Sequence, residues 1–212
     1  MDNMVTSSYV ILVSDKNEKE LYDALKTKYA DDNWIDVIVG SESYDLDESK
    51  IYILVGDSVL IDEKIKKPSV IVIDLSDSII IDMIDSPEDL SNVRNQLIDG
   101  IILHKDTLVG IDYMDIYSVL QGCKNISAGI IHSKLTSDAS ALIENLIAKA
   151  KVDISKCESA YLYVNGDIGL VEVNELANAL EAAMIDEANI AFTASYDSSK
   201  VDEFYVMVLF GS

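Results

Sequence analysis

Short, continuous runs of β-branched and other apolar residues dominate the first third of the chain. Each of four such runs has the length and composition of a strand buried on both faces: Tyr9–Val13, Ile35–Gly40, Ile51–Val55 and Ser69–Leu75. The amphipathic segment Glu18–Ala30 interrupts them with apolar residues at helical spacing, and Ile79–Ile84 fits either a fifth strand or a short helical turn. Strands broken by a helix predict parallel pairing, so we expect a small α/β sheet domain over residues 1–85.

The chain changes character at a Ser-Pro pair followed by two acidic residues, 86–89, which is a strong helix start. The apolar stripe after it predicts a helix from Pro87 to about His104, close to 27 Å long at 1.5 Å per residue. A loop over Lys105–Ile111 and a short helix over Tyr113–Cys123 follow. We therefore expect residues 86–125 to form a connecting segment built on a long central helix.

The last part of the chain alternates strands with helices. The predicted strands are Ile126–His132, Ser159–Val164, Asn189–Tyr196 and Glu203–Phe210. One helix is capped by Thr136 or Ser137, and the other covers Leu170–Met184. This order predicts a two-layer α/β domain over residues 126–212, with both helices on one face and Asp197–Lys200 as a hairpin-like connection.

Acidic residues outnumber basic ones throughout the chain. There are 38 Asp and Glu against 16 Lys and Arg, which gives a net charge of −22, and residues 1–85 alone hold 19 acidic residues and 8 lysines. Such a chain repels phosphate backbones and anionic lipid surfaces. We therefore expect no nucleic-acid partner, while the apolar share of 49% is ample for a packed core.

The sequence also bears on location and redox state. No stretch approaches the roughly 18 to 20 apolar residues that cross a bilayer, and the first residues lack a basic region followed by an apolar one. We expect a cytoplasmic protein without a transmembrane segment. Cys123 and Cys157 are too few and too far apart in sequence for a disulfide scaffold or thiolate metal site, so we expect reduced thiols.

Four motifs in the second half occur in a characteristic order. Tyr161–Glu175, with the sequence YLYVNGDIGLVEVNE, reads as a strand, a glycine turn and a helix opening. Asn189–Phe192 and Asp202–Val208 follow, and Gly110–Asp115 comes just after the central helix. In order and spacing these motifs resemble FtsZ, the prokaryotic relative of tubulin, over residues 86–212. The resemblance implies an FtsZ/tubulin-type C-terminal domain and places Gly110–Asp115 at the family's catalytic loop, Asn-x-Asp-x-x-Asp.

The first half departs from that family in its glycines. The family binds GTP with glycine-rich loops, including a run of the type Gly-Gly-Gly-Thr-Gly-Thr-Gly, because only small residues let backbone N–H groups close on phosphate oxygens. Here the first 99 residues contain two glycines, Gly40 and Gly56, and no P-loop. We expect a reduced or replaced nucleotide-binding domain and no cofactor bound autonomously, with GTP present only on a partner.

Asp112 and Asp115 are the candidate catalytic residues. In the family, the carboxylates of this loop enter the next subunit's GTP site and polarise the attacking water. The resemblance implies that Asp112 and Asp115 act in trans and that Gly110, Ile111 and Tyr113 contact the partner. The family's Asn is replaced by Gly110. The residues alone favour a structural role, in which Asp112 caps the next helix and Asp115 lies in its first turn; the resemblance puts the two interpretations on an equal footing.

The remaining candidates fit ordinary structural roles. Strand-end aspartates accept a phosphoryl group or bind Mg²⁺ in receiver-like folds, but they are also common helix caps and turn residues. We expect structural or surface roles for the isolated His104 and His132, the loop Asp45–Glu48, the strand-end Asp15 and Asp74, the turn glycines Gly166 and Gly169, and Arg94 on the polar side of the central helix.

These features predict an FtsZ-like protein without its own GTP site. It would regulate cell-division or cytoskeletal filaments by capping a true FtsZ partner or by stimulating its GTP hydrolysis, so we expect no autonomous GTPase. An open head-to-tail filament needs two complementary faces, and this chain has one. The alternative is a non-polymerising, stand-alone regulatory or ligand-binding module that can form a homodimer. The end of the sequence at Gly211-Ser212, where family members carry a partner-binding tail, favours that alternative.

Overall fold

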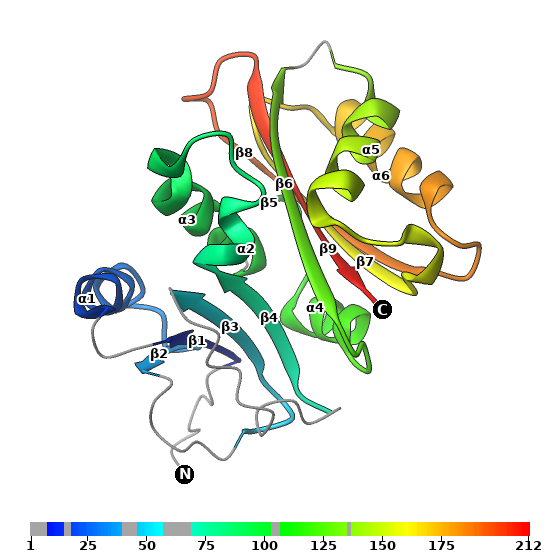
Figure 1. Ribbon diagram of the computed structural model, residues 1–212. Coiled ribbons are helices and arrows are strands. Elements are labelled where there is room, and N and C mark those ends of the chain that lie inside the picture. The colour runs from blue at the N-terminus through cyan, green and yellow to red at the C-terminus, as the bar shows by residue number, and fades with distance from the viewer. Residues whose placement is uncertain (1–7, 15–17, 40–45, 57–68, 103–106, 135–136) are drawn as a thin grey trace. The chain divides into compact units, whose positions relative to one another are not determined.

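The computed structural model describes residues 8–14, 18–39, 46–56, 69–102, 107–134 and 137–212 (Figure 1). The chain forms two compact units, residues 1–90 and 91–212. The first contains a parallel sheet and the second a mixed sheet, each with helices. The predicted α/β class is therefore confirmed. The finer division into 1–85, 86–125 and 126–212 stays a prediction.

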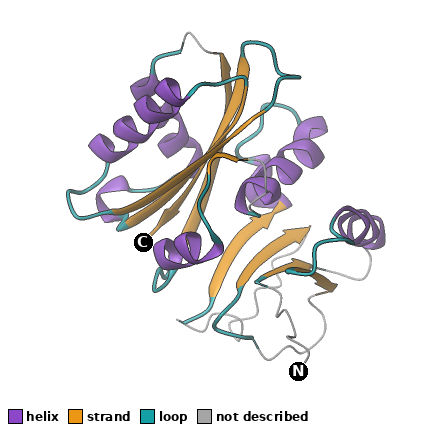
Figure 2. Cartoon of the chain, turned by 180° about the vertical axis from the view of Figure 1, so that it is seen from behind, coloured by secondary structure: helices purple, strands orange, loops and turns teal. Residues whose placement is uncertain are grey.

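The first unit is a four-stranded parallel sheet with the strand order β2-β1-β3-β4. Figure 2 shows its strands from behind. The elements are β1 (Tyr9–Val13), α1 (Lys19–Lys28), β2 (Ile35–Val39), β3 (Ile51–Gly56), β4 (Ile71–Ser76) and α2 (Asp77–Ile81). Every residue of β1 and β3 is buried, as expected of central parallel strands covered on both faces. The four predicted strands and the first helix are thus confirmed.

The structure settles one ambiguity of the first unit and corrects the length of the central helix. The stretch Ile79–Ile84 is helical at its start, where α2 buries Ile80 against the sheet. The chain then continues through a 3₁₀ turn, Pro87–Asp89, into α3 (Leu90–Ile101). This central helix is shorter than predicted: its 12 residues span about 18 Å. His104 lies outside the described residues.

The prediction for Arg94 was wrong. Its side chain is 8% exposed, and it belongs to a buried set on α3 that also includes Val93, Leu97, Ile98 and Ile101. The buried residues cover more of the helix surface than a single apolar stripe. A residue next to the stripe, such as Arg94, is therefore buried as well. Arginine tolerates such a place because its long aliphatic stem packs like an apolar side chain.

The second unit contains a five-stranded sheet with the order β5-β8-β7-β9-β6. Its elements after α3 are β5 (Thr107–Val109), α4 (Tyr113–Leu120), β6 (Ile126–Lys134), α5 (Ala139–Ala150), a 3₁₀ turn (Ile154–Lys156), β7 (Ser159–Gly166), α6 (Leu170–Ala183), β8 (Asn189–Tyr196) and β9 (Glu203–Gly211). All of the predicted strands and helices of this part are present. The short strand β5, where we expected only a loop, is an addition.

The predicted hairpin between the last two strands is wrong. β7 lies between β8 and β9, parallel to the first and antiparallel to the second. The connection crosses the end of β7, where Asp197 N donates to Gly166 O and Asp167 N donates to Glu203 O, both at 3.0 Å. Gly166 has φ +149°, and a β-carbon there would overlap Glu203 O. This close crossing explains why the turn needs glycine.

Helices cover both faces of this sheet (Figure 1). α5 and α6 lie on one face, as predicted, and share a core with inward-facing residues of β7 and β9 such as Leu162 and Val208. α3 lies on the other face, where Gly100 approaches Tyr163. The cap of α5 is Asp138, which accepts from Ser140 N at 2.8 Å; the prediction of Thr136 or Ser137 was wrong.

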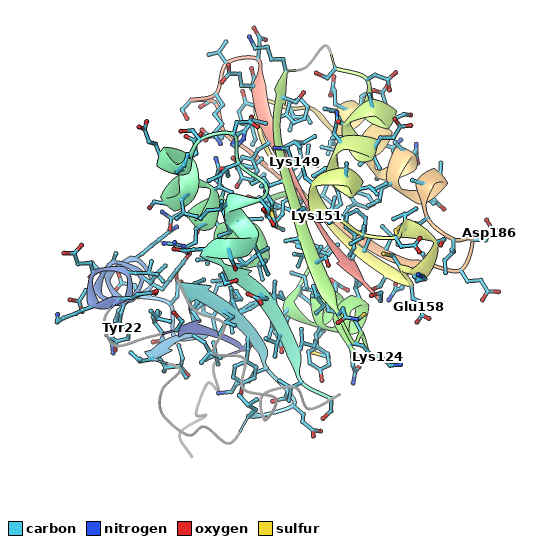
Figure 3. All side chains as sticks on the ribbon, viewed as in Figure 1. Tyr22, Lys124, Lys149, Lys151, Glu158 and Asp186 are labelled. Carbon is cyan, nitrogen blue, oxygen red and sulfur yellow. The ribbon has the colours of Figure 1, made fainter. Side chains whose placement is uncertain are left out.

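The chain finishes at the end of the sheet where β6 and β7 begin. Ser212 O accepts hydrogen bonds from the backbone N–H groups of Lys124 and Asn125, at 2.7 and 2.9 Å, and Gly211 O accepts from Glu158 N at 2.9 Å. Lys124 and Glu158 mark this end of the unit in Figure 3. The opposite end carries the finishing residues of β6, β7 and β8 and the first residues of β9.

Candidate functional site

The first candidate position is the switch point of the parallel sheet. The chain passes from β1 through α1 to β2 on one side of β1, and β3 pairs with β1 on the other side. In sheets of this kind, ligands bind at the carboxyl ends of the two strands between which the order reverses. Ser14, directly after β1, and Gly56, which ends β3, occupy that place here.

A carboxylate of the protein fills the space beside Gly56. Ser14 Oγ donates to Glu18 Oε1 at 3.2 Å. Gly56 has φ +108°, and a β-carbon there would lie 2.5 Å from Ser14 Oγ and would overlap Glu18 Oε2. Glycine is therefore required by both its conformation and the closeness of Glu18. The arrangement places an acceptor-only, negatively charged group where a phosphate-binding sheet offers donors.

The second candidate position is the loop Gly110–Asp115, which β5 holds against the second sheet. Thr107 pairs with Ser195 and Val109 with Ala194 of β8, with an irregularity between the two pairs. The hydroxyl of Thr193, a buried residue, donates to the carbonyl oxygen of Val109. These contacts fix the point where the loop leaves the sheet, immediately before Gly110.

Asp112 and Asp115 form a reciprocal capping box at the start of α4. Asp112 Oδ1 accepts from Asp115 N at 3.1 Å, and Asp115 Oδ2 accepts from Asp112 N at 2.8 Å. Two backbone donors that the helix cannot satisfy are thereby paired. The role of helix cap that the residues indicate for Asp112 is thus confirmed. Among the described residues, each of these two hydrogen bonds occupies one oxygen of one carboxylate.

The loop is accessible to another molecule. Gly110, Asp112 and Asp115 are exposed, while Ile111 and Tyr113 are half-buried. The nearest atom to a β-carbon at Gly110 would be Thr107 Oγ1, at 3.3 Å, so the chain has room there for a side chain. The two aspartates therefore present carboxylate oxygens to solvent from a fixed helix start. Their assignment as catalytic residues, and that of Gly110, Ile111 and Tyr113 as contacts, stays a prediction.

Exposed apolar side chains accompany this loop. Met114 on α4 is 59% exposed, and Leu108 on β5 is 44% exposed. Tyr196, at the end of the neighbouring strand β8, is 54% exposed. Exposed large apolar residues on adjoining elements are typical of protein contact surfaces, although isolated ones are common on any protein.

The other candidates have local partners. His132 Nε2 lies 3.0 Å from Gln96 Oε1, and Asp74 Oδ1 accepts from Ser76 N at 2.9 Å at the end of β4. Asp47 accepts from both the N–H and the hydroxyl of Ser49, which lowers the pKa of Asp47. These contacts fit the structural roles expected of them.

Some of the sequence candidates cannot be placed. Asp15 and Asp45 lie outside the described residues. In the ranges that are described, no cluster of three or more His, Cys, Asp or Glu side chains has the arrangement of a metal site. None of the helices in those ranges combines the length and apolarity that a membrane span requires.

The fold resembles that of solved tubulin-like proteins. No family model matches the sequence. An FtsZ dimer from M. jannaschii matches 92% of this chain and 67% of its own, with a TM-score of 0.58 and 16% identity. CetZ from Methanosaeta thermophila matches 96% of this chain and 62% of its own, with a TM-score of 0.51 and 11% identity. A four-stranded filament of TubZ-Bt gives a TM-score of 0.50 at 11% identity, over 96% of this chain and 59% of its own.

These comparisons define the class of fold. The chain has an FtsZ/tubulin-like fold, which confirms the resemblance read from residues 86–212 and extends the structural likeness to 92% of the chain or more. It spans about two thirds of the FtsZ chain and less of the CetZ and TubZ chains.

Sequence reasoning missed the contact between Glu18 and Gly56. The only signal was a glycine ending an apolar strand, which is common in turns. The two residues lie 38 positions apart in sequence and meet only because β1 and β3 are neighbours in the sheet. The apolar residues around the Gly110–Asp115 loop were also missed, because each belongs to a different element.

Proposed function

We propose that this chain is an FtsZ-like accessory protein that binds no GTP of its own and docks through Gly110–Asp115 onto the GTP face of a filament-forming FtsZ-family partner. There it caps the filament end or stimulates the partner's hydrolysis. In the second case, Asp112 and Asp115 supply carboxylates that orient the attacking water.

One observation carries the proposal: the carboxylate of Glu18 occupies the space against Gly56 at the switch point of the parallel sheet. Two unit charges 4 Å apart repel by about 4 kcal/mol at an effective dielectric constant of 20. A phosphate group in this position would meet that repulsion without a cradle of glycine N–H groups to offset it. The scarcity of glycine in the first 99 residues supports the same conclusion.

The docking part of the proposal is supported by the exposure of the loop and of its apolar neighbours. The capping box holds the two carboxylates in a defined place without burying them. Leu108, Met114 and Tyr196 add exposed apolar surface beside them, and such residues commonly form the centre of a protein interface. The FtsZ of the comparison is a dimer and TubZ-Bt forms a four-stranded filament, so proteins of this fold assemble with their own kind.

The nucleotide part is tested with the purified protein alone. We expect GTP and GDP to separate from it during gel filtration and equilibrium dialysis, in the presence of Mg²⁺. Retention of guanine nucleotide at micromolar concentration, or turnover of GTP by the isolated protein, would contradict the proposal.

The docking part is tested by pelleting and GTPase assays with a filament-forming FtsZ. We expect the protein to reduce polymer length or to raise the GTPase rate at substoichiometric amounts. Asp112→Asn and Asp115→Asn keep an oxygen for the capping box but remove the charge, so they should abolish stimulation and leave capping of filaments unchanged. Asp138→Asn, which changes the cap of α5 in the same way, is the matched control. No effect of the unaltered protein on either assay would exclude this role.

The same experiments bear on the stand-alone alternative. A module that does not bind filaments would leave both assays unchanged and would be a dimer, or carry a co-purified ligand, in native mass spectrometry. A monomer that associates with FtsZ would exclude that alternative.

A further inference from the structure

A pocket of about 320 Å³ opens at the end of the second sheet that is remote from Lys124. Its walls come from three elements: the polar side of α3, the end of β6 and the beginning of β9 with the connection before it. The lining residues are Asn92, Gln96, His132, Ser133, Lys134, Lys200, Glu203 and Phe204. At roughly 30 Å³ per water molecule, the pocket has room for a molecule of about ten non-hydrogen atoms.

The pocket is locally basic in a strongly acidic protein. Residues 91–212 hold eight Lys and Arg residues, and two of them, Lys134 and Lys200, line this one pocket together with a single carboxylate, Glu203. Glu203 is the cross-strand partner of Lys134, so these two side chains leave the same face of the sheet next to each other. Lys200 provides a second positive charge.

The ammonium group of Lys200 is held in place by its neighbours. Its Nζ donates to Asn165 Oδ1 at 3.1 Å and lies 4.5 Å from the centre of the Tyr205 ring. Burial lowers the pKa of Lys200 even though Asp197 and Glu203 act in the opposite direction. The ammonium group of Lys200 is therefore less well solvated than it would be in water. A bound anion next to it would compensate for part of the lost solvation.

The opposite wall supplies neutral hydrogen-bonding groups. His132 Nε2 and Gln96 Oε1 are 3.0 Å apart; when the ring donates in this contact, the amide NH₂ of Gln96 is a donor that can serve a ligand. Asn92 lies one turn earlier on α3 and carries a second amide. Phe204 also contributes to the lining, while its ring packs into the core that the sheet shares with α5 and α6.

From this arrangement we infer that the pocket binds a small organic anion of about ten non-hydrogen atoms, in which a carboxylate or phosphate group faces Lys200 and Lys134. Polar and charged groups that are placed in a concave site fix the orientation of a small molecule and provide specificity. The inference does not depend on the docking role proposed above, because none of these residues belongs to the Gly110–Asp115 loop.

Binding is tested by isothermal titration calorimetry with phenyl phosphate and benzoate. Phenol, which has the same aromatic ring but no charge at neutral pH, is the neutral probe. We expect at least one of the two anions to bind at least tenfold more tightly than phenol, and their ranking identifies the head group. Lys200→Met keeps the aliphatic stem over Tyr205 and should weaken the anion at least tenfold, as expected for a lost hydrogen bond to a charged group.

The matched control is Lys124→Met, because Lys124 lies far from the pocket. It comes just before β6, whereas Lys134 ends that strand, so the two residues are about 30 Å apart at 3.4 Å per residue. Lys124→Met should leave affinity unchanged. Lys134→Met tests the pocket from a second strand and should weaken the anion in the same direction, including if Lys200→Met fails to fold. The inference would be overturned if phenol bound as tightly as the anions, or if the Lys124 and Lys134 variants bound the anion with equal affinity. It would also be overturned if the unaltered protein bound none of the probes.

Discussion

The hydroxyl of Tyr161 donates a hydrogen bond to the carbonyl oxygen of Gly100 at 2.7 Å, in the interior of the second unit. Tyr161 lies on β7, the middle strand of the sheet, and Gly100 lies in the last turn of α3. Carbonyl groups in the last turn of a helix have no partner within the helix. The contact therefore satisfies a buried acceptor and attaches the last turn of α3 to the middle strand of the sheet.

Removing this hydroxyl should destabilise the protein. Tyr161→Phe leaves a buried carbonyl without this donor, and such losses cost about 1 to 3 kcal/mol. The measurement is urea unfolding followed by far-ultraviolet circular dichroism. Tyr22→Phe is the control, because the hydroxyl of Tyr22 accepts only an exposed hydrogen bond from Lys26 (Figure 3); it should change the free energy of unfolding by less than about 0.5 kcal/mol. Equal effects of the two variants would contradict the prediction.

Gly100→Ala should also destabilise the protein, against the usual preference for alanine in helices. A β-carbon at this position would lie 2.7 Å from Tyr163 Cδ1 and 3.0 Å from Met207 Cε. Overpacking of this kind costs about 1 to 3 kcal/mol, which exceeds the gain of up to about 1 kcal/mol from helix propensity. Gly110→Ala, with its nearest atom at 3.3 Å, should have a much smaller effect. A rise in the urea midpoint of Gly100→Ala would show that the packing relaxes around the methyl group.

The capping box predicts losses of different size for two substitutions of Asp112. Asp112→Ala removes the side-chain acceptor for Asp115 N and should lower the free energy of unfolding by about 0.5 to 2 kcal/mol. Asp112→Asn keeps an acceptor and should cost only a few tenths, since Asn and Asp are comparable caps. The two variants are compared in urea unfolding. Similar losses in both would mean that the charge of Asp112, rather than its hydrogen bond, stabilises the start of α4.

Stability should fall at alkaline pH because of two buried tyrosines. Burial raises the pKa of Tyr163 and of Tyr205 above the ordinary value of 10.0. Below pH 10 both rings are protonated in the folded and unfolded states, so their ionisation costs nothing. As the pH rises above 10, the unfolded chain releases these protons while the folded protein keeps them, and the free energy of unfolding decreases. The lowered pKa of Lys200 acts in the opposite direction up to about its ordinary value of 10.5, but it is one group against two.

The measurement is the urea midpoint at pH 9 and at pH 11 for the unaltered protein and for Tyr205→Phe. The variant lacks one of the two tyrosine hydroxyls and should lose less stability between the two values. A fall of the same size in both proteins would assign the alkaline effect to other groups.

Local patterns were sufficient to predict most elements. The continuous apolar runs at Tyr9–Val13 and Ile51–Val55 became the central strands of the parallel sheet because such runs can be stable only when both faces are covered. Asp112 caps α4, as its position before an apolar helical segment indicated. The motif Tyr161–Glu175 became β7, its glycine turn and the start of α6.

Predictions that depended on distant contacts were less successful. A strand, four polar residues and another strand suggested a hairpin, but β7 separates β8 from β9. The position of Arg94 on the polar side of the predicted helix indicates a surface residue, whereas its burial is set by what packs around α3. The pocket beside Lys200 could not be predicted either, since its lining comes from three segments that are far apart in sequence.

The sequence alone determined most of the helices and strands and the mixed α/β class, because these follow from periodicity and capping within single segments. The order and spacing of the motifs over residues 86–212 carried the resemblance to FtsZ. Only the tertiary structure decided that Glu18 lies against Gly56 and that two lysines share one pocket. The physical reason is that several strand orders are compatible with the same local composition. Which order forms depends on how completely whole faces of the sheet are buried, and no single segment contains that information.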